Sequence, residues 1–419
     1  GEGKAEVILN ISASPYHVGK GRLREKVLSE RARENCAMVF YNNLVGGQDE
    51  LVFDGGGMVF DQKGKEFARG KQFEEDLVIV DLNAGRIRNN RLRHESRPLN
   101  LSPLGIALLQ KVKKIELPEA KTGKKKSLPE RKIKKLGRLE EIYRALILGV
   151  HDYVKKNGFK KVVIGLSGGI DSSLAAVLAV DALGRENVTG LSMPSAYSSA
   201  GTQADTVKLA RNLGIKLITI PIDEIFRTYL EALREKFQGL KPDVTEENLQ
   251  ARIRGNILMA ISNKYGSLVL TTGNKSEMSV GYCTLYGDMA GGFAVIKDVP
   301  KTLVYKLSRY RNRKEGKSLI PKSVLDREPS AELRPNQKDA DTLPPYSLLD
   351  PILEAYVEED KSSEEIIAGG FNPRVVKKVI RMVDRNEYKR RQGPLGVKIT
   401  PRAFGKDRRF PLTNRYQDF

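Results

Sequence analysis

The chain has 419 residues, of which 40% are hydrophobic, and a formal net charge of +20. This length suits two or three domains with packed cores, no apolar run is long enough to cross a membrane, and two cysteines are too few for a disulfide scaffold. The composition therefore excludes membrane-spanning and disulfide-rich classes, and it indicates a cytoplasmic protein that handles negatively charged ligands.

The first 82 residues alternate short apolar stretches with one amphipathic segment. β-Branched and aromatic residues predict strands at 7–11, 38–41, 51–53, 58–61 and 77–80. Apolar residues at helical spacing predict a helix at 22–36. We therefore expect a first α/β domain at residues 1–110.

Residues 111–138 contain twelve lysines and arginines against three glutamates. Their weak periodicity indicates a basic, solvated linker between two domains. Contact with a nucleic acid is the alternative interpretation. No aromatic side chains are interleaved with these charges, so we do not expect a nucleic-acid partner.

From residue 139 onwards, strands and helices alternate. Strands are predicted at 162–166, 188–193, 216–220 and 268–271, and helices at 139–150, 173–183, 202–213, 224–237 and 246–264. This alternation favours a doubly wound parallel sheet with helices on both faces. We therefore expect a second α/β domain at residues 139–419, with its ligands at the carboxyl ends of the strands.

The most informative motif follows the strand at 162–166, where residues 167–172 read Ser-Gly-Gly-Ile-Asp-Ser. Two glycines at a strand-to-helix junction let backbone N–H groups converge on an anion at a helix N-terminus. The hydroxyls of Ser167, Ser172 and Ser173 can donate to phosphate oxygens, and the Asp171 carboxylate can hold Mg²⁺. No Gly-Lys-Ser/Thr follows, so this is not a Walker A loop. The motif resembles the Ser-Gly-Gly-x-Asp-Ser loop of the ATP pyrophosphatases, and this resemblance implies a site for the phosphates of ATP.

The loop after the strand at 268–271 should approach the same ligand. Thr272 offers a hydroxyl, and Glu277 offers a second carboxylate that could share Mg²⁺ with Asp171. The alternative is that Glu277 only stabilises a helix N-terminus. The glycines and tyrosines of residues 281–292 could stack a flat ring. Cys283 is interpreted as a packed thiol, because no histidine lies nearby in sequence to activate it.

Together these segments resemble the synthetase domain of the NAD⁺ synthetases, which have the ATP pyrophosphatase fold. The resemblance covers the chain from residue 139 and rests, in this order, on residues 165–172, 248–254, 272–277, 281–292, 298–301 and 330–345. It implies a ligase that forms a carbon–nitrogen bond. Such an enzyme amidates deamido-NAD⁺ to NAD⁺ through an adenylated intermediate, with release of AMP and pyrophosphate.

The same resemblance implies roles for individual residues. It makes Asp171 and Lys301 catalytic, and it makes Asp171 and Glu277 ligands of Mg²⁺, with ATP as co-substrate. Deamido-NAD⁺ would contact Asn248, Glu277 and Lys389. The residues implied to hold ATP are Gly165, Leu166, Ser167, Gly168, Gly169, Ile170, Asp171, Ser172, Thr272, Lys301 and Ser330. Leu285 stands where small ammonia-dependent relatives carry lysine, which favours the larger, glutamine-dependent branch.

The first domain resembles the later part of a nitrilase-like glutaminase domain, an α/β sandwich found fused to the larger synthetases. The resembling residues are 10–17, 19–20 and 41–47. The resemblance implies that Ser14 and Lys20 bind glutamine and that the catalytic Glu, Lys and Cys of that family would lie upstream of Gly1. We therefore expect this chain to need free ammonia, its intact parent to use glutamine, and the protein to form a homo-oligomer.

Two other functions remain open from the residues alone. Another ATP pyrophosphatase, such as a tRNA-thiolating enzyme, would fit the basic charge, but Cys36 and Cys283 lie in different predicted domains. A non-catalytic nucleotide-binding or RNA-binding protein would use residues 111–138. That alternative leaves Asp171 and Glu277 without a task.

Overall fold

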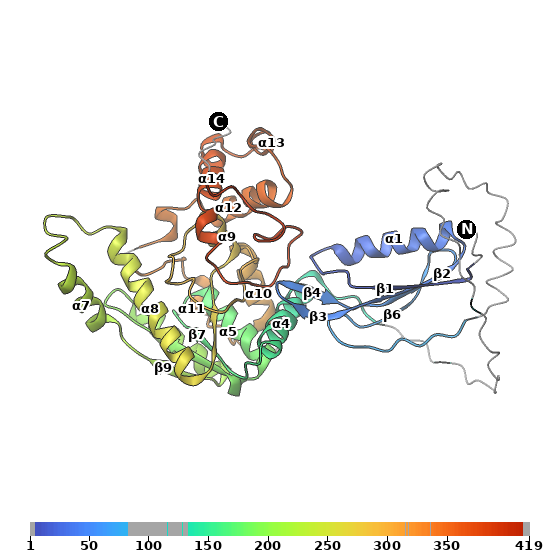
Figure 1. The fold of residues 1–419 in the computed structure, drawn as a ribbon, viewed down its shortest axis with the longest axis horizontal. Helices are drawn as coiled ribbons and strands as arrows, with labels where there is room; N and C mark the ends of the chain where they lie inside the picture. The colour runs from blue at the N-terminus through green and yellow to red at the C-terminus, as the bar shows by residue number, and fades with distance from the viewer. Residues whose placement is uncertain are drawn as a thin grey trace. The chain divides into compact units, whose positions relative to one another are not determined.

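The computed structural model describes residues 5–82, 115, 128, 133–314, 316, 318–335 and 337–413. The chain divides into two compact units (Figure 1). The first comprises Gly1–Gly46 and Phe53–Leu136, and the second comprises Gly47–Val52 and Gly137–Phe419. Most of the basic stretch at 111–138 lies outside the described residues, so its role as a linker stays a prediction.

The first unit is built on a four-stranded sheet in the order β1-β2-β5-β6. β1 (Val7–Ser12) runs parallel to β2 (Met38–Asn43), whereas β5 (Met58–Phe60) and β6 (Glu66–Arg69) continue the sheet in antiparallel pairs. Helix α1 (Lys20–Glu34) covers one face through Leu28 and Ala32, which are four residues apart and therefore share a side of the helix. β3 (Val45–Gln48) and β4 (Leu51–Asp54) form a separate two-stranded sheet.

The strand expected at 77–80 is absent from the described structure, and that prediction was wrong. Val78 and Val80 pack against the second face of the sheet, while Leu77 and Ile79 are 76% and 62% exposed. The segment thus has the alternating burial of a strand without a backbone partner. β6, which was not predicted, takes the edge position, because alternation of side chains does not reveal which segment pairs.

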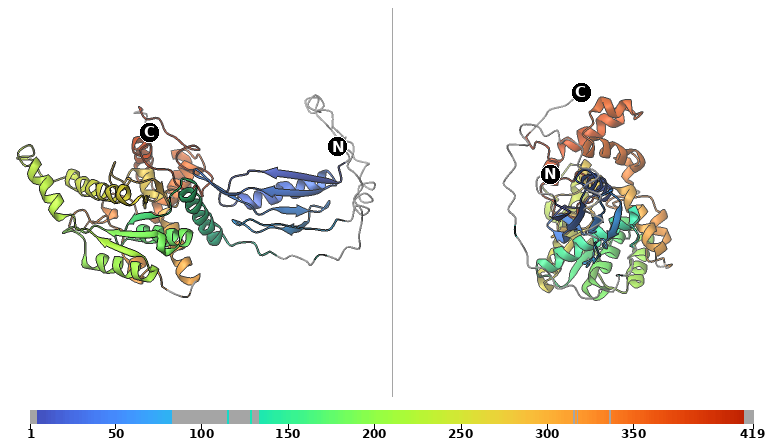
Figure 2. Two further views of the ribbon diagram at one scale, coloured as in Figure 1. Left: turned by 60° about the horizontal axis from the view of Figure 1, so that its bottom comes forward. Right: turned by 90° about the vertical axis from the view of Figure 1, so that its right-hand side faces the viewer.

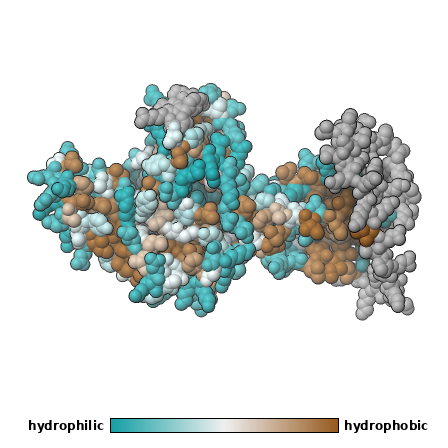
Figure 3. Space-filling model, in the orientation of Figure 1, coloured by the Kyte–Doolittle hydropathy of each residue, from teal (hydrophilic) through white to brown (hydrophobic). Residues whose placement is uncertain are grey.

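Apolar side chains remain exposed on the first unit. Leu9 and Ile11 of β1 are 73% and 89% exposed, and Leu23 and Val27 of α1 are 57% and 43% exposed. Figure 3 shows hydrophobic residues on the surface of the part that holds these elements. β1 is also an edge strand, so its outer backbone groups have no strand beside them in the described residues.

The second unit contains a five-stranded parallel sheet in the order β11-β10-β7-β8-β9. The strands are β7 (Val162–Gly165), β8 (Val188–Ser192), β9 (Lys216–Thr219), β10 (Leu268–Thr271) and β11 (Phe293–Ala294). The first four confirm the predicted strands. β11 has two residues, too few for periodicity to reveal it.

Helices cover both faces of this sheet. α4 (Arg138–Lys156), α5 (Ile170–Leu183) and α10 (Lys301–Lys314) pack against one another. α6 (Ala200–Leu213) packs on β8 and β9, and α8 (Val244–Tyr265) packs on β7 and β10 beside α7 (Asp223–Leu233). Figure 2 shows α8 on the opposite side of the strands from α6. This layered arrangement confirms the predicted doubly wound sheet.

Shorter helices complete the second unit. They are α9 (Lys275–Val280), α11 (Lys322–Asp326), α12 (Tyr346–Leu353), α13 (Ser363–Ala368), α14 (Pro373–Arg385) and α15 (Glu387–Arg390). α12, α13 and α14 pack around a separate apolar cluster that includes Leu349, Val376 and Val379. Among the described residues, no helix has the length and hydropathy needed to traverse a bilayer.

Candidate active site

The site lies where the order of the strands reverses. β7 has β8 and β9 on one side and β10 and β11 on the other, so the loops after β7 and β10 diverge at the carboxyl edge of the sheet. In doubly wound sheets this switch point opens a crevice for ligands. The predicted loops at residues 166–169 and 272–274 therefore face the same crevice.

The loop after β7 has the geometry of an anion cradle. Gly168 has a φ of +79°, and a Cβ there would lie 2.3 Å from the Thr202 carbonyl oxygen, so only glycine fits. Gly169 is the N-cap of α5, which aims the helix N-terminus at the loop. The Ser167 and Ser172 hydroxyls lie 3.2 Å apart, and the hydroxyls of Ser172 and Ser173 both donate to the Gly169 carbonyl, at 3.1 and 2.7 Å.

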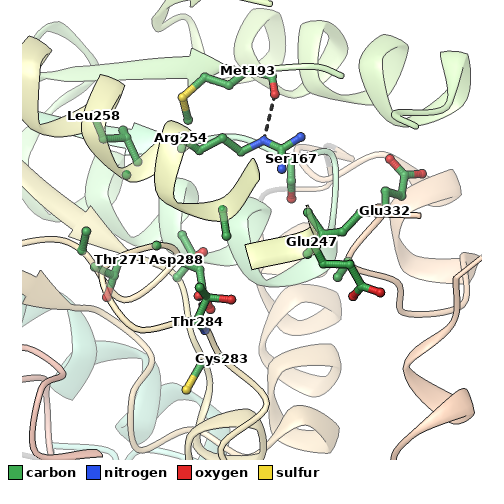
Figure 4. A pocket seen from close by; sticks show the side chains of 18 of the residues that line it. Ser167, Met193, Glu247, Arg254, Leu258, Thr271, Cys283, Thr284, Asp288 and Glu332 are labelled. Atoms are coloured by element: carbon green, nitrogen blue, oxygen red, sulfur yellow. Dashed lines mark hydrogen bonds between the residues drawn. The ribbon is translucent and has the colours of Figure 1, made fainter. Parts of the chain in front are cut away.

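A cavity of about 410 Å³ opens beside this loop (Figure 4). Six of the residues predicted to bind substrates line it: Gly165, Leu166, Ser167, Asn248, Thr272 and Lys389. Figure 4 shows Leu258 and Thr271 on one side of the cavity and Glu247 and Glu332 on the other. Asp288 lies beside Thr271 in the same view, so carboxylates line the cavity on both sides.

Arg254 places a buried cation at this cavity. Its Nε donates to the Met193 carbonyl at 3.0 Å, as Figure 4 shows, and burial lowers its pKa to about 10. The guanidinium therefore remains charged at neutral pH. Arg254 lines the cavity and is tied to the residue that follows β8.

Asp171, Glu277 and Lys301 meet next to the phosphate loop. The Lys301 ammonium donates to Asp171 Oδ2, and it donates to Glu277 Oε1 at 3.2 Å. Asn274, the N-cap of α9, donates its side-chain amide to Asp171 Oδ1 at 3.0 Å. Three elements far apart in sequence, α5, α9 and α10, therefore bring two acids and one lysine together.

The carboxylate of Glu277 has a raised pKa in this cluster. Burial is the largest effect and raises its pKa to about 8; the Lys301 ammonium opposes this shift, and Asp171 and Asp339 add to it. Burial also disfavours the charged form of Lys301, but the neighbouring carboxylates, Asp171 first, outweigh it and raise the pKa of the lysine. An added cation would stabilise the ionised form of Glu277.

Residues 327–335 and 337–341, which we call the lid segment, run along the cavity. Arg327 donates to the Gly168 carbonyl at 3.2 Å, and Glu332 accepts from the Thr202 hydroxyl at 2.9 Å. Ser330, predicted to contact ATP, donates to the Gln337 carbonyl and so holds the segment's own turn. Ala331, Glu332, Leu333 and Gln337 line the cavity.

Comparison with known proteins identifies the family. Residues 142–393 match the family model described as NAD synthase. A glutamine-dependent NAD⁺ synthetase of Thermotoga maritima is 52% identical over 427 residues, which cover 100% of this chain and 71% of that relative. The solved glutamine-dependent NAD⁺ synthetase of Acinetobacter baumannii, in complex with adenosine diphosphate, is 43% identical with a TM-score of 0.65, over 98% of this chain and 68% of that one.

The chain belongs to the family of glutamine-dependent NAD⁺ synthetases. Its membership confirms the predicted enzyme class, a ligase that forms carbon–nitrogen bonds, and it favours this reading over the other ATP pyrophosphatases. The structure of a glutamine-dependent NAD⁺ synthetase from Cytophaga hutchinsonii, at 21% identity and a TM-score of 0.74, covers 98% of this chain and 71% of that one. At that identity it supports the fold alone.

Two residues predicted to contact deamido-NAD⁺ hold the loop at 281–292. The Lys389 ammonium donates to the carbonyls of Gly281 and Cys283 at 2.8 and 2.9 Å. Asn248 accepts from the Thr284 hydroxyl at 2.7 Å. Burial raises the pKa of the Cys283 thiol to about 12, as expected for a packed thiol rather than a nucleophile.

Asp339 is the residue of this NAD⁺ synthetase site that sequence reasoning missed. It is 5% exposed, and its carboxylate accepts from the Tyr346 hydroxyl at 2.8 Å. It lies within the motif at 330–345, but nothing in its immediate sequence distinguishes it from Asp341. Only its burial next to Lys301 does so.

In the first unit, Ser14 belongs to a polar network. Its backbone N–H donates to Asn43 at 2.8 Å, and its hydroxyl accepts from the Arg24 guanidinium at 3.2 Å. Arg24 also pairs with the buried Asp54 at 2.6 Å. Lys20 begins α1. These contacts give Ser14 a structural partner and leave its predicted role toward glutamine a proposal.

The carboxylate cluster fits Mg²⁺. Within the described ranges, no group of three or more His, Cys, Asp or Glu side chains is arranged to hold a metal by itself. Mg²⁺, however, is commonly held by one or two carboxylates together with phosphate oxygens. Asp171 and Glu277 supply hard oxygen atoms that converge on one point beside the phosphate loop. In this structure both carboxylates contact the Lys301 ammonium, and burial is the largest cause of the raised pKa of Glu277.

Proposed function

We propose that the cavity and its carboxylate cluster perform the ATP-dependent amidation of deamido-NAD⁺ to NAD⁺, with release of AMP and pyrophosphate. One observation carries this proposal: a glycine-bearing phosphate loop, a cavity of about 410 Å³ and the Asp171–Lys301–Glu277 cluster meet at one edge of the sheet. The membership of the chain in the NAD⁺ synthetase family supports it.

The reaction requires activation because a carboxylate is a poor acceptor for ammonia. An oxygen of the deamido-NAD⁺ carboxylate attacks the α-phosphorus of ATP, and the bond to the leaving pyrophosphate breaks. Ammonia then attacks the acyl carbon, and AMP leaves with the electron pair of the carbon–oxygen bond. Negative charge grows on the phosphates, so fixed donors stabilise the transition state.

The chain places such donors around the phosphates. Residues 165–172 supply backbone N–H groups at the N-terminus of α5, and Thr272 supplies a hydroxyl from the neighbouring strand end. The Lys301 ammonium, 3% exposed, supplies a cation that cannot swing into solvent. Asp171 and Glu277 would hold Mg²⁺, which when bound neutralises charge on the triphosphate.

The second substrate would occupy the side of the cavity that faces the loop at 281–292. Asn248 and Lys389 line this side, and Glu277 lies beyond it at the start of α9. A dinucleotide carries a carboxylate, two phosphates and two flat rings, so it suits a cavity with both cations and apolar walls. Ser330 would hold the lid segment over ATP through its hydrogen bond to the Gln337 carbonyl.

For the first unit we propose a nitrilase-like glutaminase fold at residues 1–110, in which Ser14 and Lys20 contact glutamine. The polar network of Ser14, Asn43 and Arg24 supports a loop of fixed shape at that position. We further propose that the protein acts in the cytoplasm and forms a homo-oligomer. Light scattering of the purified chain tests the oligomeric state.

The test is pyrophosphate release by the purified chain with deamido-NAD⁺, ATP, Mg²⁺ and ammonium. We expect turnover, and we expect none in control reactions that lack deamido-NAD⁺. The same assay with glutamine in place of ammonium tests whether the first unit releases ammonia from glutamine. Absence of turnover with ammonium, in a chain that binds ATP, would contradict the proposal.

A further inference from the structure

Asp339 links the lid segment to the centre of the site. Its carboxylate accepts a hydrogen bond from the Tyr346 hydroxyl at 2.8 Å, and the Tyr282 hydroxyl donates to it as well. The Asp339 backbone N–H donates to the Pro329 carbonyl at 3.1 Å, which closes the lid segment into a loop. The side chain therefore points away from solvent although the segment lies at the surface.

Tyr346 connects Asp339 to Lys301. The Lys301 ammonium lies 5.2 Å from the centroid of the Tyr346 ring, a distance at which a cation is attracted to the ring face. The hydroxyl of the same ring is held by Asp339. The carboxylate of Asp339 also helps to raise the pKa of Lys301, so the two charges sense each other.

The lid segment is fastened at further points, three of which reach the phosphate loop and α8. Arg327 reaches the phosphate loop at Gly168, Gln250 donates to the Leu333 carbonyl at 2.9 Å, and Gln337 donates to Glu247 at 3.1 Å. The first point touches the phosphate loop and the others lie on α8. Of the contacts in the described residues that hold the lid segment, the one at Asp339 connects it to Lys301, which contacts both Asp171 and Glu277.

We propose that Asp339 is a positioning residue for the amidation: through Tyr346 it holds the Lys301 ammonium between Asp171 and Glu277 while the lid segment covers the cavity. This inference rests on the proposed function. The alternative is that Asp339 only anchors the lid segment and has no effect on Lys301.

Three variants of the full chain separate these two roles. Asp339→Asn keeps the size of the side chain but replaces the charged acceptor of the Tyr346 hydroxyl with a neutral amide, which weakens the hydrogen bond that holds the ring. Tyr346→Phe keeps the ring beside Lys301 and removes the hydroxyl. Asp341→Asn is the matched control, because Asp341 lies in the same turn, is 41% exposed and pairs with Arg334 at the surface.

The experiment measures kcat and KM for ATP with ammonium, together with the rate of tryptic cleavage after Lys338. We expect Asp339→Asn to lower kcat between about tenfold and a hundredfold, since a misplaced catalytic group costs up to about that much. KM for ATP and the cleavage rate should change less than about twofold, because the phosphate loop is untouched. Asp341→Asn should leave kcat unchanged.

Wild-type kcat in Asp339→Asn would overturn the inference. So would a loss of kcat that comes with faster cleavage after Lys338 and a higher KM, because that combination indicates an anchor for the lid segment only. If Asp339→Asn fails to fold, Tyr346→Phe decides by the same readouts. An inactive wild-type chain would count against the proposed function instead, and the inference would fall with it.

Discussion

The two units of this chain bury charged side chains for different ends. In the first, Arg24 and Asp54 are 9% and 2% exposed and form one ion pair. The Arg24 guanidinium also donates to the carbonyls of Ser14 and Pro15. In the second, Asp171, Glu277 and Asp339 surround Lys301. The first arrangement is balanced and shapes a loop, whereas the second has surplus negative charge that a cationic ligand would balance.

The apolar residues of the two units differ as well. The second unit encloses its sheet between helices, so that Ile164, Leu174 and Leu191 are fully buried. The first leaves Leu9 and Ile11 exposed on an edge strand. The second unit thus has both a closed core and a charged cavity, while the first offers an open apolar edge. The comparison predicts that changes in the two units have separable consequences.

The largest expected effect concerns the balanced ion pair. Arg24→Met should lower the free energy of unfolding of the first unit by about 3–5 kcal/mol, because it strands the buried Asp54 carboxylate. Hydrogen exchange of β2 against that of β7 measures this. Arg31→Met, whose pair with Glu34 is 66% and 58% exposed, is the control and should cost less than about 1 kcal/mol. Equal effects of both variants would contradict the assignment.

Asp171→Ala tests the surplus acids of the second unit. We expect pyrophosphate release with ammonium to fall by about 10²–10³-fold, the usual cost of losing one preorganised charge contact. Circular dichroism should show an intact fold. Ser14→Ala in the first unit should leave ammonium-driven turnover unchanged. A fully active Asp171→Ala would refute the role of this carboxylate.

Gly168→Ala probes the shape of the phosphate loop. The left-handed backbone alone costs about 1–3 kcal/mol, and the clash with the Thr202 carbonyl adds to it, so affinity for a non-hydrolysable ATP analogue should drop at least about tenfold. Calorimetry measures the affinity. Gly158→Ala separates the two causes, since Gly158 has a φ of +80° with nothing within 4 Å of its added Cβ. It should bind the analogue normally.

The last prediction is a pH dependence of stability. Burial raises the pKa of Glu277 to about 8 from the ordinary 4.5, so between these values the folded chain holds a proton that the unfolded chain has released. Stability of the ligand-free protein should therefore fall as pH rises, by at most about 1.4 kcal/mol per pH unit from this group. Glu277→Gln should flatten the slope of urea unfolding free energy against pH. Parallel slopes in both proteins would contradict this.

Local patterns were sufficient where the chemistry is contiguous in sequence. Residues 165–172 form the predicted loop, with Gly168 in the left-handed conformation that its position demands. Residues 272–277 do place Glu277 beside Asp171. The prediction failed at 77–80, because alternating apolar residues describe one face of a segment and carry no information about its partner. Sequence reasoning missed Asp339 for a related reason: its neighbours in space come from α9, α10 and α12.

The order of residues alone determined the doubly wound sheet, the phosphate loop and the family, since each depends on periodicity or on residues adjacent along the chain. Tertiary structure alone decided which acids share Lys301, and that Asp339 rather than Asp341 reaches the centre. Burial and charge balance are properties of distances between elements. Those distances exist only after the sheet and its helices have packed.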